Sequence, residues 1–145
     1  MSFYLRQITS GDVPKIEHIA LSVMQSGAEI VFGEADEDGI STIFSGDFAI
    51  GELEVNPKGS DLFDEEVAEF TDKLQNASGD VDRIQTALKD ASCIIAIQVL
   101  FEGRSPEEVM NDMLPLMTWL QENCPGLTQA DGEGFYDGET LILEI

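Results

Sequence analysis

Positive charge is what this sequence has least of. Its 145 residues include 7 Lys and Arg against 29 Asp and Glu, which gives a formal net charge of −22 at pH 7. Phosphate groups are bound mainly by basic side chains, so this balance argues against nucleic acid and anionic membranes as partners. It favours solubility and attracts basic proteins. We therefore expect a basic protein as the partner, with no nucleic acid and no membrane.

Histidine and cysteine are scarce as well. The one histidine, His18, and the two cysteines, Cys93 and Cys124, lie far apart in the sequence. Two cysteines are too few for a disulfide framework, and the ligand spacing of a zinc site is missing. The sequence also lacks the glycine-rich motifs of nucleotide-binding proteins and the nucleophile motif of hydrolases. We expect no metal, no cofactor, no catalytic residue and hence no enzymatic activity.

Long hydrophobic runs are absent too. The longest apolar stretch is 94–101, which is interrupted by Gln98 and falls far short of the roughly 20 residues that span a bilayer. The first residues carry no basic and apolar leader that would indicate a secretory signal. We expect a cytoplasmic protein that folds as a single domain over residues 1–145, a common domain size.

Hydrophobic periodicity predicts an α+β fold with a mostly antiparallel sheet and helices packed on one face. Strand patterns cover 3–8, 28–33, 40–44, 48–55, 92–101, 128–136 and 139–145. Helix start signals stand at Ser10 or Asp12, at Ser60 or Asp61, at Asp80 and at Ser105. In the strand 48–55, the apolar residues change phase between Ile50 and Leu53, which predicts a β-bulge at or next to Gly51.

The two ends of the chain follow the same order of elements. Residues 3–44 and 92–145 each predict a strand, a helix, a strand, an Asp-Gly turn and a strand. This order suggests two β-α-β-β units, in halves 1–56 and 92–145, joined by an acidic helical segment over 60–91, and thus an internal duplication. The arrangement resembles that of GyrI-like and other ferredoxin-like small bacterial proteins, without a matching motif. The stretch 129–137 resembles uncharacterised bacterial proteins, from which no functional residue can be carried over.

An acidic run marks the helix that begins near residue 61. The macrodipole favours carboxylates in the first turn, but it does not stabilise Glu69 or Asp72, and Glu65 and Glu69 repel each other at i,i+4 spacing. Two explanations remain, namely general solubility or a surface that steers a basic partner. The candidate partner-binding residues here are Glu65, Glu66, Glu69 and Asp72.

Three aromatic residues complete the candidate site. Trp119 lies off the apolar stripe of its helix, and Phe135 and Tyr136 lie in the glycine-rich segment 131–139. This segment fits either a ligand or partner surface or a tight, twisted hairpin packed beneath a helix.

These features favour a non-catalytic, acidic protein-binding domain. An inhibitor or immunity-type protein for a basic enzyme or toxin is its concrete form. The alternative is a small-molecule-binding domain with a pocket between the two halves, and an enzyme of another type ranks third. The oligomeric state stays open at this stage.

Overall fold

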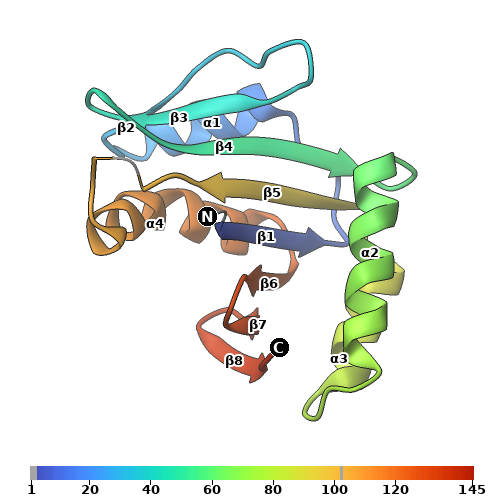
Figure 1. The fold of residues 1–145 in the computed structure, drawn as a ribbon. Helices are drawn as coiled ribbons and strands as arrows, with labels where there is room; N and C mark the ends of the chain where they lie inside the picture. The colour runs from blue at the N-terminus through green and yellow to red at the C-terminus, as the bar shows by residue number, and fades with distance from the viewer. Residues whose placement is uncertain (1–2, 102) are drawn as a thin grey trace.

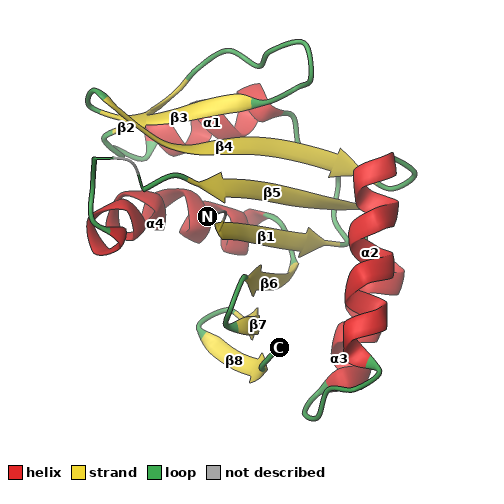
Figure 2. Ribbon diagram, viewed as in Figure 1, coloured by secondary structure: helices red, strands yellow, loops and turns green. Residues whose placement is uncertain are grey.

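The computed structural model describes residues 3–101 and 103–145, which form four helices and eight strands. Figures 1 and 2 show how these elements are arranged. The strands are β1 (Phe3–Thr9), β2 (Ile30–Phe32), β3 (Ser41–Ser45), β4 (Phe48–Pro57), β5 (Cys93–Val99), β6 (Gly126–Ala130), β7 (Gly134–Asp137) and β8 (Thr140–Leu143). The helices are α1 (Ile16–Gln25), α2 (Asp61–Leu74), α3 (Val81–Asp90) and α4 (Pro106–Asn123).

All eight strands form one sheet in the order β2-β3-β4-β5-β1-β6-β7-β8, and every neighbouring pair is antiparallel. The first strands of the two halves, β1 and β5, therefore lie side by side in the centre. The predicted α+β fold, with helices packed on an antiparallel sheet, is confirmed.

Helices cover both faces of the sheet, where we expected them on one. Alternate residues of β5 divide between two cores: Cys93, Ile95, Ile97 and Val99 pack under α1 and α4, and Ile94 packs under α2 and α3. Figure 1 shows α2 in front of the sheet, with α1 and α4 behind it. The acidic segment is therefore more than a linker, because its helices bury a second hydrophobic core.

The predicted bulge in β4 is confirmed. Ile43 pairs with Gly51 and Phe44 pairs with Ala49, so Ile50 is the extra residue. The bulge brings Ile50 and Leu53 to the same face, where both are fully buried. Phe48, at the start of β4, is exposed.

The predicted strand 128–136 is wrong in one respect, because it is divided into β6 and β7 by a turn at 131–133. Gly132 and Gly134 both have positive φ angles, which extended L-residues rarely adopt, and the chain reverses there. A side chain on Gly134 would also overlap the carbonyl oxygen of Leu143. The glycines thus form a second tight hairpin before the turn that connects β7 to β8. That turn lies at Gly138-Glu139, one residue later than the predicted Asp137-Gly138 turn, because Asp137 pairs with Thr140.

The two halves share their order of elements but differ in their order within the sheet. After α1, the chain enters at the outer edge with β2 and moves inward to β4, whereas after α4 it starts beside β1 and moves outward to β8. Internal duplication therefore stays a hypothesis. Within the described ranges, no helix is both long enough and apolar enough to cross a membrane.

Candidate functional site

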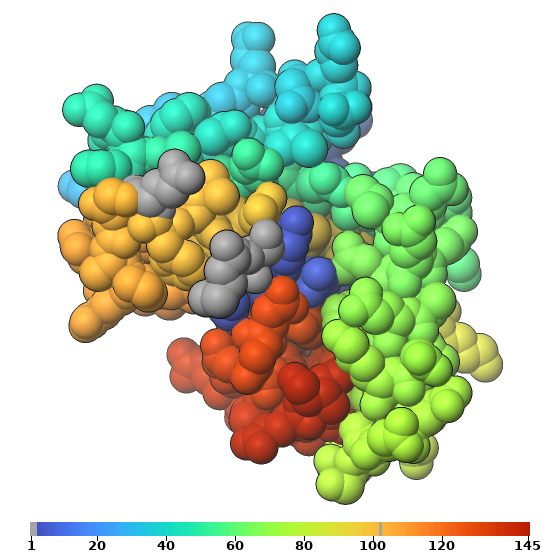
Figure 3. All heavy atoms as spheres, in the orientation of Figure 1, coloured from blue at the N-terminus to red at the C-terminus, as the bar shows by residue number. Residues whose placement is uncertain are grey.

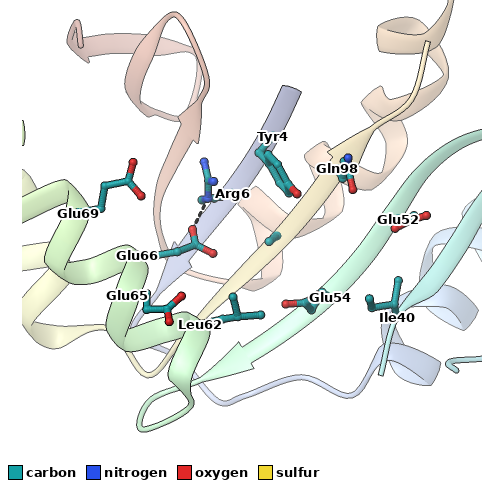
Figure 4. Close-up of a pocket in the computed structure, with 11 residues that line it drawn as sticks. Tyr4, Arg6, Ile40, Glu52, Glu54, Leu62, Glu65, Glu66, Glu69 and Gln98 are labelled. Atoms are coloured by element: carbon teal, nitrogen blue, oxygen red, sulfur yellow. Dashed lines mark ion pairs between the residues drawn. The ribbon is translucent and has the colours of Figure 1, made fainter. Parts of the chain in front are cut away.

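A groove of about 370 Å³ opens where α2 meets the middle of the sheet. Its floor comes from β1, β4 and β5, and α2 forms one wall (Figure 4). The lining residues are Tyr4, Arg6, Ile40, Glu52, Glu54, Leu62, Glu65, Glu66, Glu69, Ala96 and Gln98.

The strand register places the floor residues in rows across the sheet. Glu54 pairs with Ala96, which pairs with Arg6, and in the next row Glu52 pairs with Gln98 and Gln98 with Tyr4. Directly paired residues share a face. Ala96 has the smallest side chain in the first row, so the floor is lowest between Glu54 and Arg6.

The wall of the groove follows from the amphipathic pattern of α2. Ser60 caps the helix by accepting a hydrogen bond from the backbone N–H of Phe63. Phe63, Phe70 and Leu74 are buried against the sheet. The adjacent stripe has the spacing i, i+3, i+4, i+7 and faces the groove. It consists of Leu62, Glu65, Glu66 and Glu69.

Arg6 is the single cation among the described residues that line the groove, and it joins α2 to the sheet. Its Nε forms an ion pair with Glu66, as the dashed line in Figure 4 marks, and its Nη1 lies 2.9 Å from Asp131 Oδ1 and 2.6 Å from Gln129 Oε1. The guanidinium carbon stands 4.9 Å from the ring centre of Tyr4 and 5.4 Å from that of Phe70. These contacts fix the position of the Arg6 side chain and neutralise its charge.

The remaining acidic residues of the groove are less compensated. Glu69 pairs with Lys73 at 3.1 Å, whereas Glu52, Glu54 and Glu65 form no ion pair with a described residue. Five glutamates and one arginine line the groove, which leaves a formal lining charge of −4. The groove therefore carries a concentrated negative potential.

Two carboxyl groups beside Arg6 differ in their pKa. Burial raises the pKa of Glu66, Arg6 opposes this effect, and repulsion from Glu54 and Glu69 adds to it. Burial also acts to raise the pKa of Asp131, but hydrogen bonds from Gln129 and Arg6 outweigh it, and the pKa of Asp131 is lowered. Burial is thus the main cause of the raised pKa of Glu66, and the neighbouring carboxylates add a smaller effect.

The chemistry of these groups is that of a cation-binding surface. Among the described residues, the lining offers carboxylates, one amide and one phenol, and it includes no serine, cysteine or histidine. In the part of the chain that the structure describes, no group of three or more His, Cys, Asp or Glu is arranged to hold a metal ion. An ammonium or guanidinium group is the ligand that carboxylates of this kind bind well.

The structure brings together only some of the predicted partner-binding residues. Glu65, Glu66 and Glu69 line the groove, whereas Asp72 is exposed on α2 outside it. Tyr136 and Trp119 are half-buried and pack against the core under α1 and α4, on the opposite face of the sheet. Trp119 contacts His18 there, edge to face.

Phe135 needs a correction, because it was expected at a partner surface and is 0% exposed. Its ring packs edge to face against Phe70 of α2, with 5.4 Å between the centroids. The glycine-rich segment is thus a tight hairpin packed beneath a helix, which was the alternative interpretation.

The residues on the floor of the groove were not predicted from the sequence. Glu52 and Glu54 alternate with Leu53 and Val55, so a single strand already indicates that the two carboxylates share the outer face. Arg6 lies in the central strand β1, and a charged residue in a central strand indicates that it pairs with an oppositely charged group. Neither signal could reveal that β1 and β4 lie on either side of β5.

Comparisons with known proteins add no identification. No family model matches this chain, and no curated protein or solved structure is significantly similar to it.

Proposed function

We propose that this protein is a non-catalytic binding domain whose groove accepts cationic side chains of a basic protein partner. An inhibitor or immunity-type protein for a basic enzyme or toxin is the concrete form. The observation that carries the proposal is that Glu52, Glu54 and Glu65 lie around one groove and form no ion pair with any described residue.

Two physical effects support this function. A chain of net charge −22 attracts a basic partner over a distance of about a Debye length, near 10 Å at 0.1 M salt. The groove then supplies fixed acceptors for the charged groups, which gives orientation and specificity. Arg6 and Glu66 stabilise the wall, so little reorganisation is needed when the partner arrives.

The test is a measurement of association rates with matched variants. The partner is obtained by affinity capture from the native cell. Wild-type protein is then compared with a groove variant (Glu52→Gln, Glu54→Gln, Glu65→Gln) and a control variant (Glu17→Gln, Glu122→Gln, Glu139→Gln). Both variants lose three negative charges, but the control residues are exposed outside the groove.

We expect the groove variant to associate about tenfold more slowly and the control variant to change by less than about twofold. The wild-type association rate should also fall steeply with salt. If both variants slow association equally, the effect belongs to net charge, and the groove is not the binding site.

A cationic small molecule is the second candidate ligand. The groove lies where the central strands β1 and β5 of the two halves meet, and its volume falls within the range of about 300–1,000 Å³ that is usual for ligand pockets. Spermidine that raised the melting temperature of the wild-type protein and the control variant, but not of the groove variant, would favour this candidate.

A further inference from the structure

Part of the groove-bearing face carries no helix. On this side α2 and α3 bury a core with residues of β1, β5 and β6–β8. Figures 1 and 3 show α2 at the end of β4, and among the described residues no helix lies in front of β2 and β3. The uncovered strands β2 and β3 point their alternate residues to this face. We call Val31 and Phe44 the outer apolar pair.

The outer apolar pair is fixed by the sheet register. Val31 pairs directly with Phe44, and the two side chains are 55% and 36% exposed. Their strand neighbours Ile30, Phe32 and Ile43 point the other way and are buried under α1 and α4. Neighbouring exposed apolar residues on a flat strand surface favour contact with a partner.

Apolar residues also continue from the outer pair into the groove. Thr42 on β3, which lies between Phe44 on the same strand and Ile40 just before it, pairs with Glu52 on the groove floor. Ile40 lines the groove itself, and so does Leu62, which is 45% exposed on α2. Apolar and acidic side chains are thus interleaved on one continuous surface.

We propose that the occupant of this surface is a basic amphipathic helix of the protein partner. This inference rests on the proposed function. The helix lies along β3, with its apolar side on the outer apolar pair and its lysine or arginine side chains in the groove. Strands are about 4.8 Å apart, so β2 and β4 are separated by roughly 10 Å, and a helix of about 10–12 Å diameter along β3 reaches both.

Charge favours a basic helix as the occupant over a second copy of the chain, a nucleic acid or an anionic lipid. A second copy of the chain would bring another 22 negative charges onto an acidic groove, and repulsion opposes such a dimer. Nucleic acids and anionic lipids are repelled in the same way. A basic helix gains attraction at the groove and burial of apolar area at the outer pair.

The test uses a defined probe, a stapled 18-residue helix with a lysine stripe beside a leucine stripe and a fluorescent label. Binding is measured by anisotropy at low and high salt. An outer-pair variant (Val31→Thr, Phe44→Thr) keeps β-forming residues in both strands. Its control (Leu21→Gln, Met24→Gln) removes two exposed apolar residues from α1, on the opposite side of the sheet.

The proposal expects about tenfold weaker binding for the groove variant, about fivefold weaker binding for the outer-pair variant and less than about twofold change for the α1 control. If the groove variant alone binds more weakly, the proposed function stands and the helix placement is wrong. If no variant differs from the wild type, both are wrong.

If the outer-pair variant fails to fold, a second measurement on the wild-type protein tests the placement of the helix. In wild-type protein with ¹³C-labelled methyl groups, the bound probe should give intermolecular NOEs between its leucine methyls and the Val31 methyls. Saturated probe without these NOEs would overturn the placement.

Discussion

The two faces of the sheet are formed by the same strands but covered to different extents. Behind the sheet, α1 and α4 bury one large core that includes residues from β1 to β6. In front, α2 and α3 bury a smaller core over β1, β5 and β6–β8 and leave the rest open. The open part contains the groove and the outer apolar pair.

β5 shows most clearly what decides the difference. Its residues facing the α1–α4 core are Cys93, Ile95, Ile97 and Val99, all buried. Its residues facing the other side change from Ile94 under α2 and α3, to Ala96 on the groove floor, to Gln98 further out. Side chains become small and then polar where the helical cover ends, as expected for a surface that meets solvent or a partner.

The largest expected effect contrasts two phenylalanines on the same face. Phe135→Ala should lower the free energy of unfolding by about 3–5 kcal/mol, because a fully buried ring leaves a cavity beneath α2. Phe44→Ala should cost less than about 1 kcal/mol, because its ring is already partly in water. Urea unfolding of both variants checks this, and equal losses would show that the outer strands are covered after all.

Removing the cation of the groove should have the next largest effect. Arg6→Met leaves Glu66 and Asp131 without their partner while keeping an apolar stem, and it should cost about 3 kcal/mol. The pKa of Glu66 should rise further, because Arg6 now lowers it. Thermal unfolding and ¹³C titration of the carboxyl groups measure both effects, and an unchanged Glu66 pKa would contradict the ion pair.

A smaller effect is expected at the β4 bulge, on the face of the sheet that α1 and α4 cover. A side chain on Gly51 would overlap the terminal methyl of Met113, so Gly51→Ala should cost about 1–3 kcal/mol by overpacking. Adding Met113→Leu removes that methyl and should restore part of the loss in a double-mutant cycle. Additive losses would mean that Gly51 is required for the backbone of the bulge rather than for packing.

The smallest effect concerns pH, with opposite signs for the two carboxyl groups near Arg6. The pKa of Glu66 is raised from 4.5 in the folded protein, so its contribution to stability decreases as pH rises through that range. The pKa of Asp131 is lowered from 3.8, so its contribution is present above 3.8 and is lost as pH falls below it.

Glu66→Gln should therefore gain stability relative to the wild type as pH rises from 4.5 to 7. The loss caused by Asp131→Asn should shrink below pH 3.8. Urea unfolding across this pH range measures both trends, and trends with the same sign would contradict the assignment.

The sequence predicted local features better than their arrangement. The bulge beside Gly51, the cap at Ser60 and the helix start at Ser105 all follow from short-range patterns, and the structure contains each of them. The turn predicted at Asp137-Gly138 lies one residue later, at Gly138-Glu139. The division of 128–136 was missed because Gly132 and Gly134 act through backbone angles, which hydrophobic alternation does not reveal.

The sequence revealed the wall of the groove but not its floor. Glu65, Glu66 and Glu69 were found because they lie on one helix, where spacing alone shows a shared face. Glu54, Ala96 and Arg6 come from three strands whose neighbours are set by long-range pairing. Phe135 was selected by the composition of its segment and Trp119 by its place off the apolar stripe of its helix, and neither signal distinguishes a buried ring from an exposed one.

The central claim is that a basic partner binds the open part of the sheet. Amide chemical-shift mapping of ¹⁵N-labelled protein, titrated with the lysine–leucine helix, tests it most directly. The account predicts that the largest shifts occur at Val31, Phe44, Glu52, Glu54 and Glu65, with little change along α1 and α4. Shifts centred on α1 and α4, or spread evenly over the acidic surface, would contradict it.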